Sequence, residues 1–163
     1  MHRFLRRVWL LCAARFLILG VLVLPTAATA APDAVAQDML ARLNDIRAAE
    51  RLQPLVLDRR LMAAADDHAQ YLSTTGDVGH RGRNGDDLAA RLDEFGYRYR
   101  AGAENVAAGQ PSVQDVVADW MDSAGHRKNI LLPQVQDLGV GVVDGPLGGQ
   151  DRPFWVIILG AKR

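Results

Sequence analysis

The sequence has almost no cysteine. Among 163 residues the single cysteine is Cys12, which lies within an apolar run near the amino terminus. Leu11 precedes it where a lipid-attachment motif has a small residue, and the apolar run continues beyond it, so we do not expect a lipid anchor there. The rest of the chain therefore has no disulfide and no thiol chemistry, and its stability must come from packing.

The sequence also lacks an excess of charge of either sign. It has 19 basic and 19 acidic residues, but four of the arginines lie among the first thirty residues. The remainder has 15 basic and 19 acidic residues, a net charge of −4. This balance gives no basic footprint for nucleic acid, so we expect no nucleic-acid partner. About 130 residues are enough for one domain with its own core.

The first thirty residues have the pattern of an export signal. Residues 1–7 are basic, residues 8–24 are apolar except for Arg15, and Ala28-Thr29-Ala30 supplies small residues before a cleavage point. The apolar run is longer than the roughly 7–15 residues usual in a signal peptide, so a retained membrane anchor is the alternative. The Ala-rich segment after Pro25 favours cleavage. We therefore predict a signal peptide at 1–30, a domain at 31–163, and a secreted or periplasmic protein whose only membrane contact is the cleaved signal.

Apolar spacing and capping residues predict helices in the first half of that domain. Expected helices cover residues 33–51, residues 58 to about 74, residues 86 or 87 to 95, and a short segment that begins at Pro111 and Ser112. Gly125 is expected to interrupt the last helix and to present His126 at its end. Residues 55–57 are expected to form a short extended link.

Strands are expected after residue 97. Residues 97–109 form one, and residues 137–143 and 154–159 form an antiparallel hairpin with a turn at 144–149. Glycine alternates with apolar residues over 137–143, which indicates a strand with one face close to another element. No internal repeat or low-complexity segment interrupts the domain. The pattern predicts an α+β layered fold.

Three polar residues are candidates for chemistry. His80 lies in a loop, residues 75–87, that has four glycines; Glu104 lies on a small-residue strand; His126 follows Gly125. Together they are suited to a divalent metal site, with zinc and a water in the open position. Alternatively, Glu104 orients an imidazole for acid–base catalysis. The structural alternative is a hydrogen-bonding or capping role for each of them.

Other polar residues favour structural roles. His68 has Leu72 rather than a second histidine four residues later, so it is not part of a two-histidine zinc helix and is expected to be buried and hydrogen-bonded. Asn44 and Arg47 are expected to pack or cap. Ser123 lacks the strand-turn-helix elbow of a serine nucleophile.

Several motifs occur in the order found in one family. They are LNDIR (43–47), LQPLVLDRRLMAAADDHA (52–69), GHRGRNGDDLAARLDEFGY (79–97), AENVAAG (103–109), WMDSAGHRKNIL (120–131) and LGVGVV (138–143). This order resembles the bacterial branch of the CAP superfamily, which groups SCP-like extracellular domains, cysteine-rich secretory proteins, antigen 5 and pathogenesis-related proteins. The bacterial branch dispenses with the disulfides of the eukaryotic members.

The resemblance implies a three-layer α-β-α sandwich with a small antiparallel sheet and a cleft. Eukaryotic relatives line this cleft with two histidines and two acids that can hold a divalent metal. By motif, His80 and His126 match the histidines and Glu104 matches the first acid. The position of the second acid is occupied by Ser123, for which Asp119 or Asp122 is a possible substitute, and Ala103 replaces the glycine usual before the Glu-Asn pair.

Three functions are compatible with this pattern. The leading hypothesis is a non-enzymatic binding module for a lipid, a small apolar molecule or a protein outside the cytoplasm, with His80, Glu104 and His126 as ligands for Zn²⁺ or another divalent cation. The second is an extracellular hydrolase, a metal-dependent or His/Glu peptidase with Glu104 and His126 as catalytic candidates. The third is a purely structural envelope domain.

Overall fold

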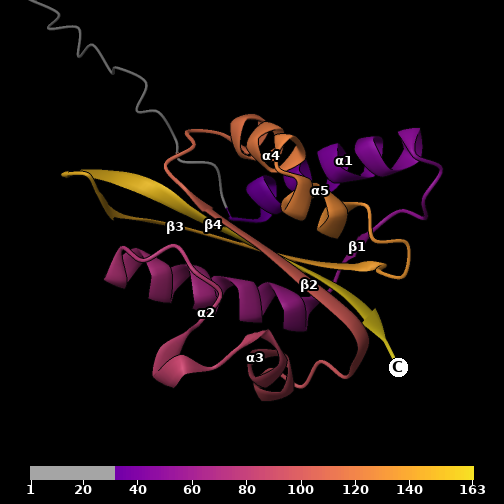
Figure 1. The fold of residues 1–163 in the computed structure, drawn as a ribbon, viewed down its shortest axis with the longest axis horizontal. Helices are drawn as coiled ribbons and strands as arrows, with labels where there is room; N and C mark the ends of the chain where they lie inside the picture. Colours follow the sequence, from indigo (N-terminus) through magenta and orange to yellow (C-terminus); the bar gives the residue numbers. More distant parts are fainter. Residues whose placement is uncertain (1–31) are drawn as a thin grey trace, which may run out of the picture.

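The computed structural model describes residues 32–163, and the signal peptide expected at 1–30 lies outside them. A four-stranded sheet is covered by helices on both faces (Figure 1). Helices α2 (Arg59–Thr75) and α3 (Leu88–Glu94) cover one face. Helices α1 (Pro32–Ala49), α4 (Val113–Asp122) and α5 (Ala124–Ile130) cover the other. The predicted α+β class and three-layer α-β-α sandwich are confirmed.

The sheet is mixed. Its strands are β1 (Val56–Leu57), β2 (Tyr99–Ala108), β3 (Asp137–Leu147) and β4 (Gln150–Lys162), in the order β1-β3-β4-β2. β4 pairs antiparallel with both β2 and β3, whereas β1 pairs parallel with β3. The segment expected as an extended link is thus an edge strand. Two residues are too few for a sequence pattern to separate a strand from a link.

The β3–β4 hairpin is longer than predicted. Pairing continues through Gly145–Arg152 to Leu147–Gln150, and the turn is limited to Gly148 and Gly149. Both glycines have positive φ, 61° and 83°, as two-residue hairpin turns that match strand twist require. The glycines and proline at 145–149 had predicted a wider turn, but Gly145 and Pro146 remain paired.

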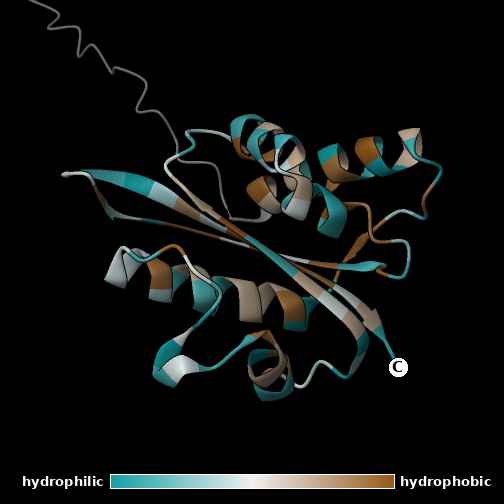
Figure 2. Cartoon of the chain, in the orientation of Figure 1, coloured by the Kyte–Doolittle hydropathy of each residue, from teal (hydrophilic) through white to brown (hydrophobic). Residues whose placement is uncertain are grey.

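Alternate residues of β4 enter two separate cores. Trp155, Ile157 and Leu159 pack under α1, α4 and α5, whereas Phe154, Val156 and Ile158 pack against α2 and α3. A strand with both faces covered is expected to be apolar throughout, as this one is. Along α1, hydrophobic and hydrophilic segments alternate, as in a helix with one buried face (Figure 2).

Glycines allow β3 to lie against α2. A Cβ at Gly139 would collide with the backbone of Leu61, and one at Gly141 would collide with the backbone of Ala65. The prediction that one face of this strand lies close to another element is confirmed. This contact fixes α2, which contains His68, on the sheet.

Arg47 and Asn44 have the packing roles predicted for them. The fully buried Arg47 donates hydrogen bonds to four carbonyls, those of Gln53, Ile130, Leu132 and Val135. Asn44 exchanges two hydrogen bonds with the backbone of Leu55. These bonds join α1 to the end of α5 and to the segment before β3.

The predicted break in the fourth helix was placed two residues too late. Ser123 is extended, with φ −91° and ψ 119°, and it separates α4 from α5. Gly125 lies inside α5, and His126 occupies the first turn of this second helix rather than the end of the first. Glycine is a weak helix breaker near an end, where tertiary contacts determine the boundary.

Candidate functional site

His80 and Glu104 form a hydrogen-bonded pair. Nδ1 of His80 lies 2.9 Å from Oε1 of Glu104. The carboxylate only accepts, so Nδ1 carries the proton and donates it. The Glu104 side chain is 3% exposed, whereas that of His80 is 59% exposed. A buried strand residue therefore orients a surface imidazole and leaves its Nε2 turned away from the pair.

Arg91 supports this pair from inside the protein. Its Nη2 donates to Oε2 of Glu104 at 2.9 Å, and its side chain is 1% exposed. Its Nη1 donates to Oδ2 of Asp86 at 3.1 Å, and Nη2 also contacts the His80 carbonyl at 3.4 Å. One buried guanidinium thus links α3, β2 and the loop that contains His80. We call His80, Glu104 and Arg91 the dyad network.

The glycine-rich loop fits closely around Arg91. Gly82 donates from its backbone to the Asp86 carbonyl at 2.9 Å. A Cβ at Gly82 would lie 2.7 Å from Nη1 of Arg91 and 2.6 Å from Oδ1 of Asp86. Tertiary contacts therefore determine the conformation of this segment. Its glycine-rich sequence alone did not predict the position of His80.

His68 lies behind the dyad network, as a buried and hydrogen-bonded helix residue. Its Nε2 donates to the Gly79 carbonyl at 3.0 Å and lies 3.8 Å from Oε1 of Glu104. Among residues 32–163 its Nδ1 has no hydrogen-bond partner. Burial lowers the pKa of His68, so this ring is neutral and fixes the residue before His80.

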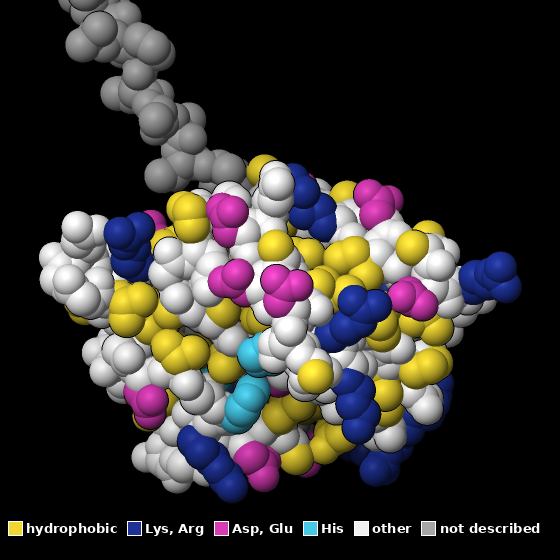
Figure 3. All heavy atoms as spheres, turned by 45° about the horizontal axis from the view of Figure 1, so that its top comes forward, with side chains coloured by type: hydrophobic (Ala, Val, Ile, Leu, Met, Phe, Trp, Pro, Cys, Tyr) yellow, Lys and Arg dark blue, Asp and Glu magenta, His cyan; other side chains and the backbone are white. Residues whose placement is uncertain are grey.

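His126 is positioned beside the dyad network by two asparagines. Asn105, next to Glu104 on β2, donates to the His126 carbonyl at 3.1 Å. Asn129 donates to the Glu104 carbonyl at 3.1 Å and to Oδ1 of Asn105 at 2.9 Å. α5 is thus tied to the strand that contains Glu104. Histidine side chains lie together at the centre of the face in Figure 3.

The two surface histidines have opposite electrostatic tendencies. The hydrogen bond to Glu104 raises the pKa of His80. Burial, followed by the nearby charge of His80, lowers the pKa of His126. The same surface therefore presents one imidazole whose charged form is stabilised beside one whose neutral form is stabilised.

The predicted metal ligands come together only in part. His80 and Glu104 are bonded, and His126 lies near His80, yet residues 32–163 contain no group of three or more His, Cys, Asp or Glu arranged to hold a metal ion. Both oxygens of Glu104 are engaged, one by the cation of Arg91. A divalent cation would have to compete with Arg91 for this carboxylate, and the zinc site stays a prediction.

Ser123 and the acids near it do not complete the set. Ser123 contributes backbone hydrogen bonds at the junction of α4 and α5. The Asp119 carboxylate accepts from Gln110 at 2.8 Å on the exposed side of α4. Within the described part of the chain, neither Asp119 nor Asp122 shares an ion pair or hydrogen bond with the dyad network.

Sequence reasoning missed Arg91, Asn105 and Asn129. A signal for Arg91 was present, because Leu88, Arg91, Leu92 and Phe95 follow the i, i+3, i+4, i+7 spacing of a buried helix face. An arginine on such a face needs acceptors inside the protein. The two asparagines offer no comparable signal, since their hydrogen-bond partners lie on distant elements.

Comparison with known proteins agrees with the fold and the motifs. The family model described as "Cysteine-rich secretory protein family", CAP, matches residues 40–159. YkwD of Bacillus subtilis is 33% identical over 119 residues, which cover 71% of this chain and 46% of that protein. The chain thus spans less than half the length of this relative. In residues 32–163, no helix is long and apolar enough to cross a membrane.

Solved structures share the architecture. An extracellular protein with an SCP domain from Bacillus anthracis superposes with a TM-score of 0.70 at 25% identity, over 83% of this chain and 45% of that one. An outer surface protein from Borrelia burgdorferi gives a TM-score of 0.72 at 17% identity, over 80% of this chain and 94% of that one, and shows the fold alone. With a family match over most of the domain, the chain belongs to the CAP family.

Proposed function

We propose that this chain is an extracytoplasmic binding module that recognises its ligand at the surface around His80 and His126. The observation that carries the proposal is the 2.9 Å bond between His80 Nδ1 and Glu104 Oε1, with Glu104 held by Arg91. An exposed histidine with no binding role would not require a buried ion pair that orients its ring. An imidazole oriented in this way presents Nε2 at a fixed position.

The chemistry of this surface favours a ligand with an acceptor oxygen. Because Glu104 raises the pKa of His80, the protonated ring offers a charge-assisted N–H donor. His126, kept towards its neutral form, offers a second polar contact. A phospholipid headgroup or a carboxylate of a protein partner meets this requirement. We assign the lipid as the primary ligand class, in line with the family resemblance.

The location outside the cytoplasm rests on relatives and on the amino-terminal pattern. The Bacillus anthracis protein is described as extracellular and the Borrelia burgdorferi protein as an outer surface protein. Residues 1–30 have the composition of an export signal. Cell fractionation of the producing bacterium, with an antibody to the domain, tests this directly. Recovery in the cytoplasmic fraction would overturn it.

Ligand binding is tested by NMR of the imidazole signals. Short-chain phosphatidylglycerol, kept below its micelle concentration, is titrated into wild type and into the His80→Ala/His126→Ala double variant. Saturable shifts of both histidines, with affinity lost in the double variant and kept in Arg152→Gln, support the proposal. Equal affinity in all three proteins places the lipid elsewhere and contradicts it.

The predicted metal is tested separately by calorimetric zinc titration of the same proteins. Binding near one site per chain, lost in the double variant, establishes a metal site at these histidines. Absence of binding removes zinc and leaves the proposed ligand site unaffected, because the dyad network is complete without it.

A hydrolase is the second candidate, and the dyad network is the specific observation in its favour. A carboxylate that orients Nδ1 of an imidazole leaves Nε2 available as a general base. The catalytic candidates from sequence were Glu104 and His126; the geometry adds His80 as the ring that Glu104 orients. Release of fluorescent peptides from labelled casein, abolished by His80→Ala in folded protein, would establish this activity. If neither binding nor turnover is found, the structural envelope role remains.

A further inference from the structure

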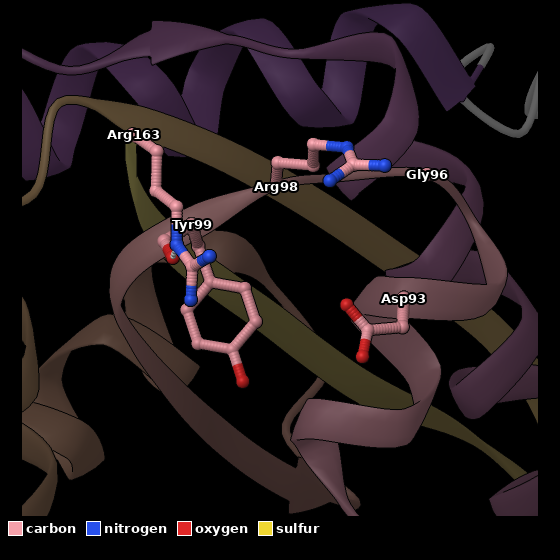
Figure 4. A pocket seen from close by; sticks show the side chains of 5 residues that line it. All are labelled: Asp93, Gly96, Arg98, Tyr99 and Arg163. Carbon is pink, nitrogen blue, oxygen red and sulfur yellow. Dashed lines mark hydrogen bonds between the residues drawn. The ribbon is translucent and has the colours of Figure 1, made fainter.

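A polar cavity lies where α3 ends and β2 begins. It has a volume of about 430 Å³ and is lined by Asp93, Gly96, Arg98, Tyr99 and Arg163. Figure 4 shows Tyr99 and Arg163 on one side of this cavity and Asp93 on the other, with Arg98 between them. None of these residues belongs to the dyad network or to its supporting loop.

The chain turn that opens this cavity depends on Gly96. Its φ is 70°, in the left-handed region. This conformation ends α3 and lets the backbone turn towards β2 immediately after the helix. The pairing of β2 with β4 is irregular between Tyr99 and Ala101. The strand end is therefore displaced from a regular ladder.

Among the described residues, the cationic side chains of this cavity have no carboxylate partner. Arg163 donates from Nε to the Tyr99 carbonyl at 2.9 Å, which fixes its guanidinium, and its two terminal nitrogens have no hydrogen-bond partner within residues 32–163. Within residues 32–163, the Arg98 side chain makes no ion pair or hydrogen bond, and the Tyr99 hydroxyl makes none either. The donors that face the cavity exceed the acceptors.

The neighbouring cation shows that pairing is otherwise the rule at this end of the sheet. Lys162, one residue before Arg163, contacts Asp58 at 2.9 Å and Asp137 at 3.2 Å. Tyr97, two residues before Tyr99, donates to Asp137. Asp58 and Asp137 are thus used by Lys162 and Tyr97, whereas within residues 32–163 the two arginines form no ion pair with Asp93, the acid on the opposite wall of the cavity.

We propose that this cavity is an anion site that binds the carboxylate or phosphate group of a small solute between Arg98 and Arg163. Guanidinium groups match the paired oxygens of both anions, and the Tyr99 hydroxyl supplies a further donor. Asp93 on the opposite wall accepts from a hydroxyl or ammonium on the same solute. The class of ligand is therefore a small acid that also has a donor group.

The test follows arginine side-chain N–H signals by NMR while sodium phosphate, and in a separate arm sodium acetate, is added at constant ionic strength. The proteins are wild type, Arg98→Gln/Arg163→Gln, and Arg100→Gln as a matched control on the same strand. Arg100 contacts the Gln134 carbonyl and does not line the cavity. Circular dichroism confirms that each variant is folded.

We expect saturable shifts at Arg163 in wild type and in the control, with binding at least about tenfold weaker in the double variant. Saturation by phosphate alone or by acetate alone supports the site and identifies the anion. No saturation in wild type overturns the proposal. An equal loss in Arg100→Gln also overturns it, because the effect would then come from general positive charge.

Discussion

Nη2 of Arg91 lies 2.9 Å from Oε2 of Glu104, and both side chains are almost wholly buried. This ion pair joins α3 to β2, and the secondary structure of neither element explains a buried charge at its position. Its effect is to hold the carboxylate that orients His80. The interior of the protein thus controls the geometry of a surface imidazole.

The first prediction concerns this pair. Arg91→Gln leaves the Glu104 charge buried with one partner fewer, so the free energy of unfolding is expected to fall by about 3–5 kcal/mol. Urea unfolding measures it. Arg127→Gln is the control, because its 3.2 Å contact with Glu50 is exposed and is worth about 0–1 kcal/mol.

A double-mutant cycle isolates the interaction. Arg91→Gln/Glu104→Gln is expected to cost less than the sum of its single variants by at least about 1 kcal/mol. Strict additivity would show that the two side chains act independently.

The second prediction concerns His68 and acid. Burial lowers its pKa in the folded state, so below about pH 6.5 the unfolded chain binds a proton that the folded chain does not. The contribution of His68 to wild-type stability should fall as the pH falls, by up to about 1.4 kcal/mol per pH unit, until the lowered folded pKa is reached.

His68→Gln, which keeps a donor near the Gly79 carbonyl, should remove this slope. The comparison requires unfolding free energies from pH 7 to pH 5. Identical pH profiles for the two proteins would contradict a neutral, buried His68. His80 has the opposite sign: its stabilisation is full below about pH 6.5 and is lost as the pH rises through its raised folded pKa.

The third prediction concerns the contact between β3 and α2. Gly139→Ala places a Cβ against the Leu61 backbone, which cannot move without displacing the helix. The expected destabilisation is about 1–3 kcal/mol or more. Gly125→Ala is the control: it lies in α5 with nothing within 4 Å of an added Cβ, and should stabilise by about 0.5–1 kcal/mol. Thermal unfolding of both variants checks the pair, and a neutral Gly139→Ala would contradict the close packing.

Much of the fold follows from local pattern. The apolar strand at 154–159, the glycine alternation in β3 and the helical spacing of α1 each identify an element with its buried face. Boundaries that depend on tertiary contacts do not follow. Ser123 rather than Gly125 separates α4 from α5, and β1 is a strand only because Val56 and Leu57 pair with β3.

The candidate site was predictable only in its surface members. His80, Glu104 and His126 occupy conspicuous local contexts, but their mutual geometry depends on Arg91, Asn105 and Asn129, which come from three different elements. Sequence spacing does not encode a hydrogen bond from Asn129 to the Glu104 carbonyl. Nor does it show that Arg91 occupies one oxygen of the carboxylate expected to bind a metal.

The most direct test of the proposed binding site is nitrogen-15 NMR of the His80 ring in wild type and in Glu104→Gln. An imidazole oriented by a carboxylate should be protonated at Nδ1 when neutral and should titrate above the usual histidine pKa, with the pKa falling towards that usual value in the variant. A His80 that titrates at the ordinary histidine pKa in both proteins would show that Glu104 does not control the ring, and would contradict the proposed binding site.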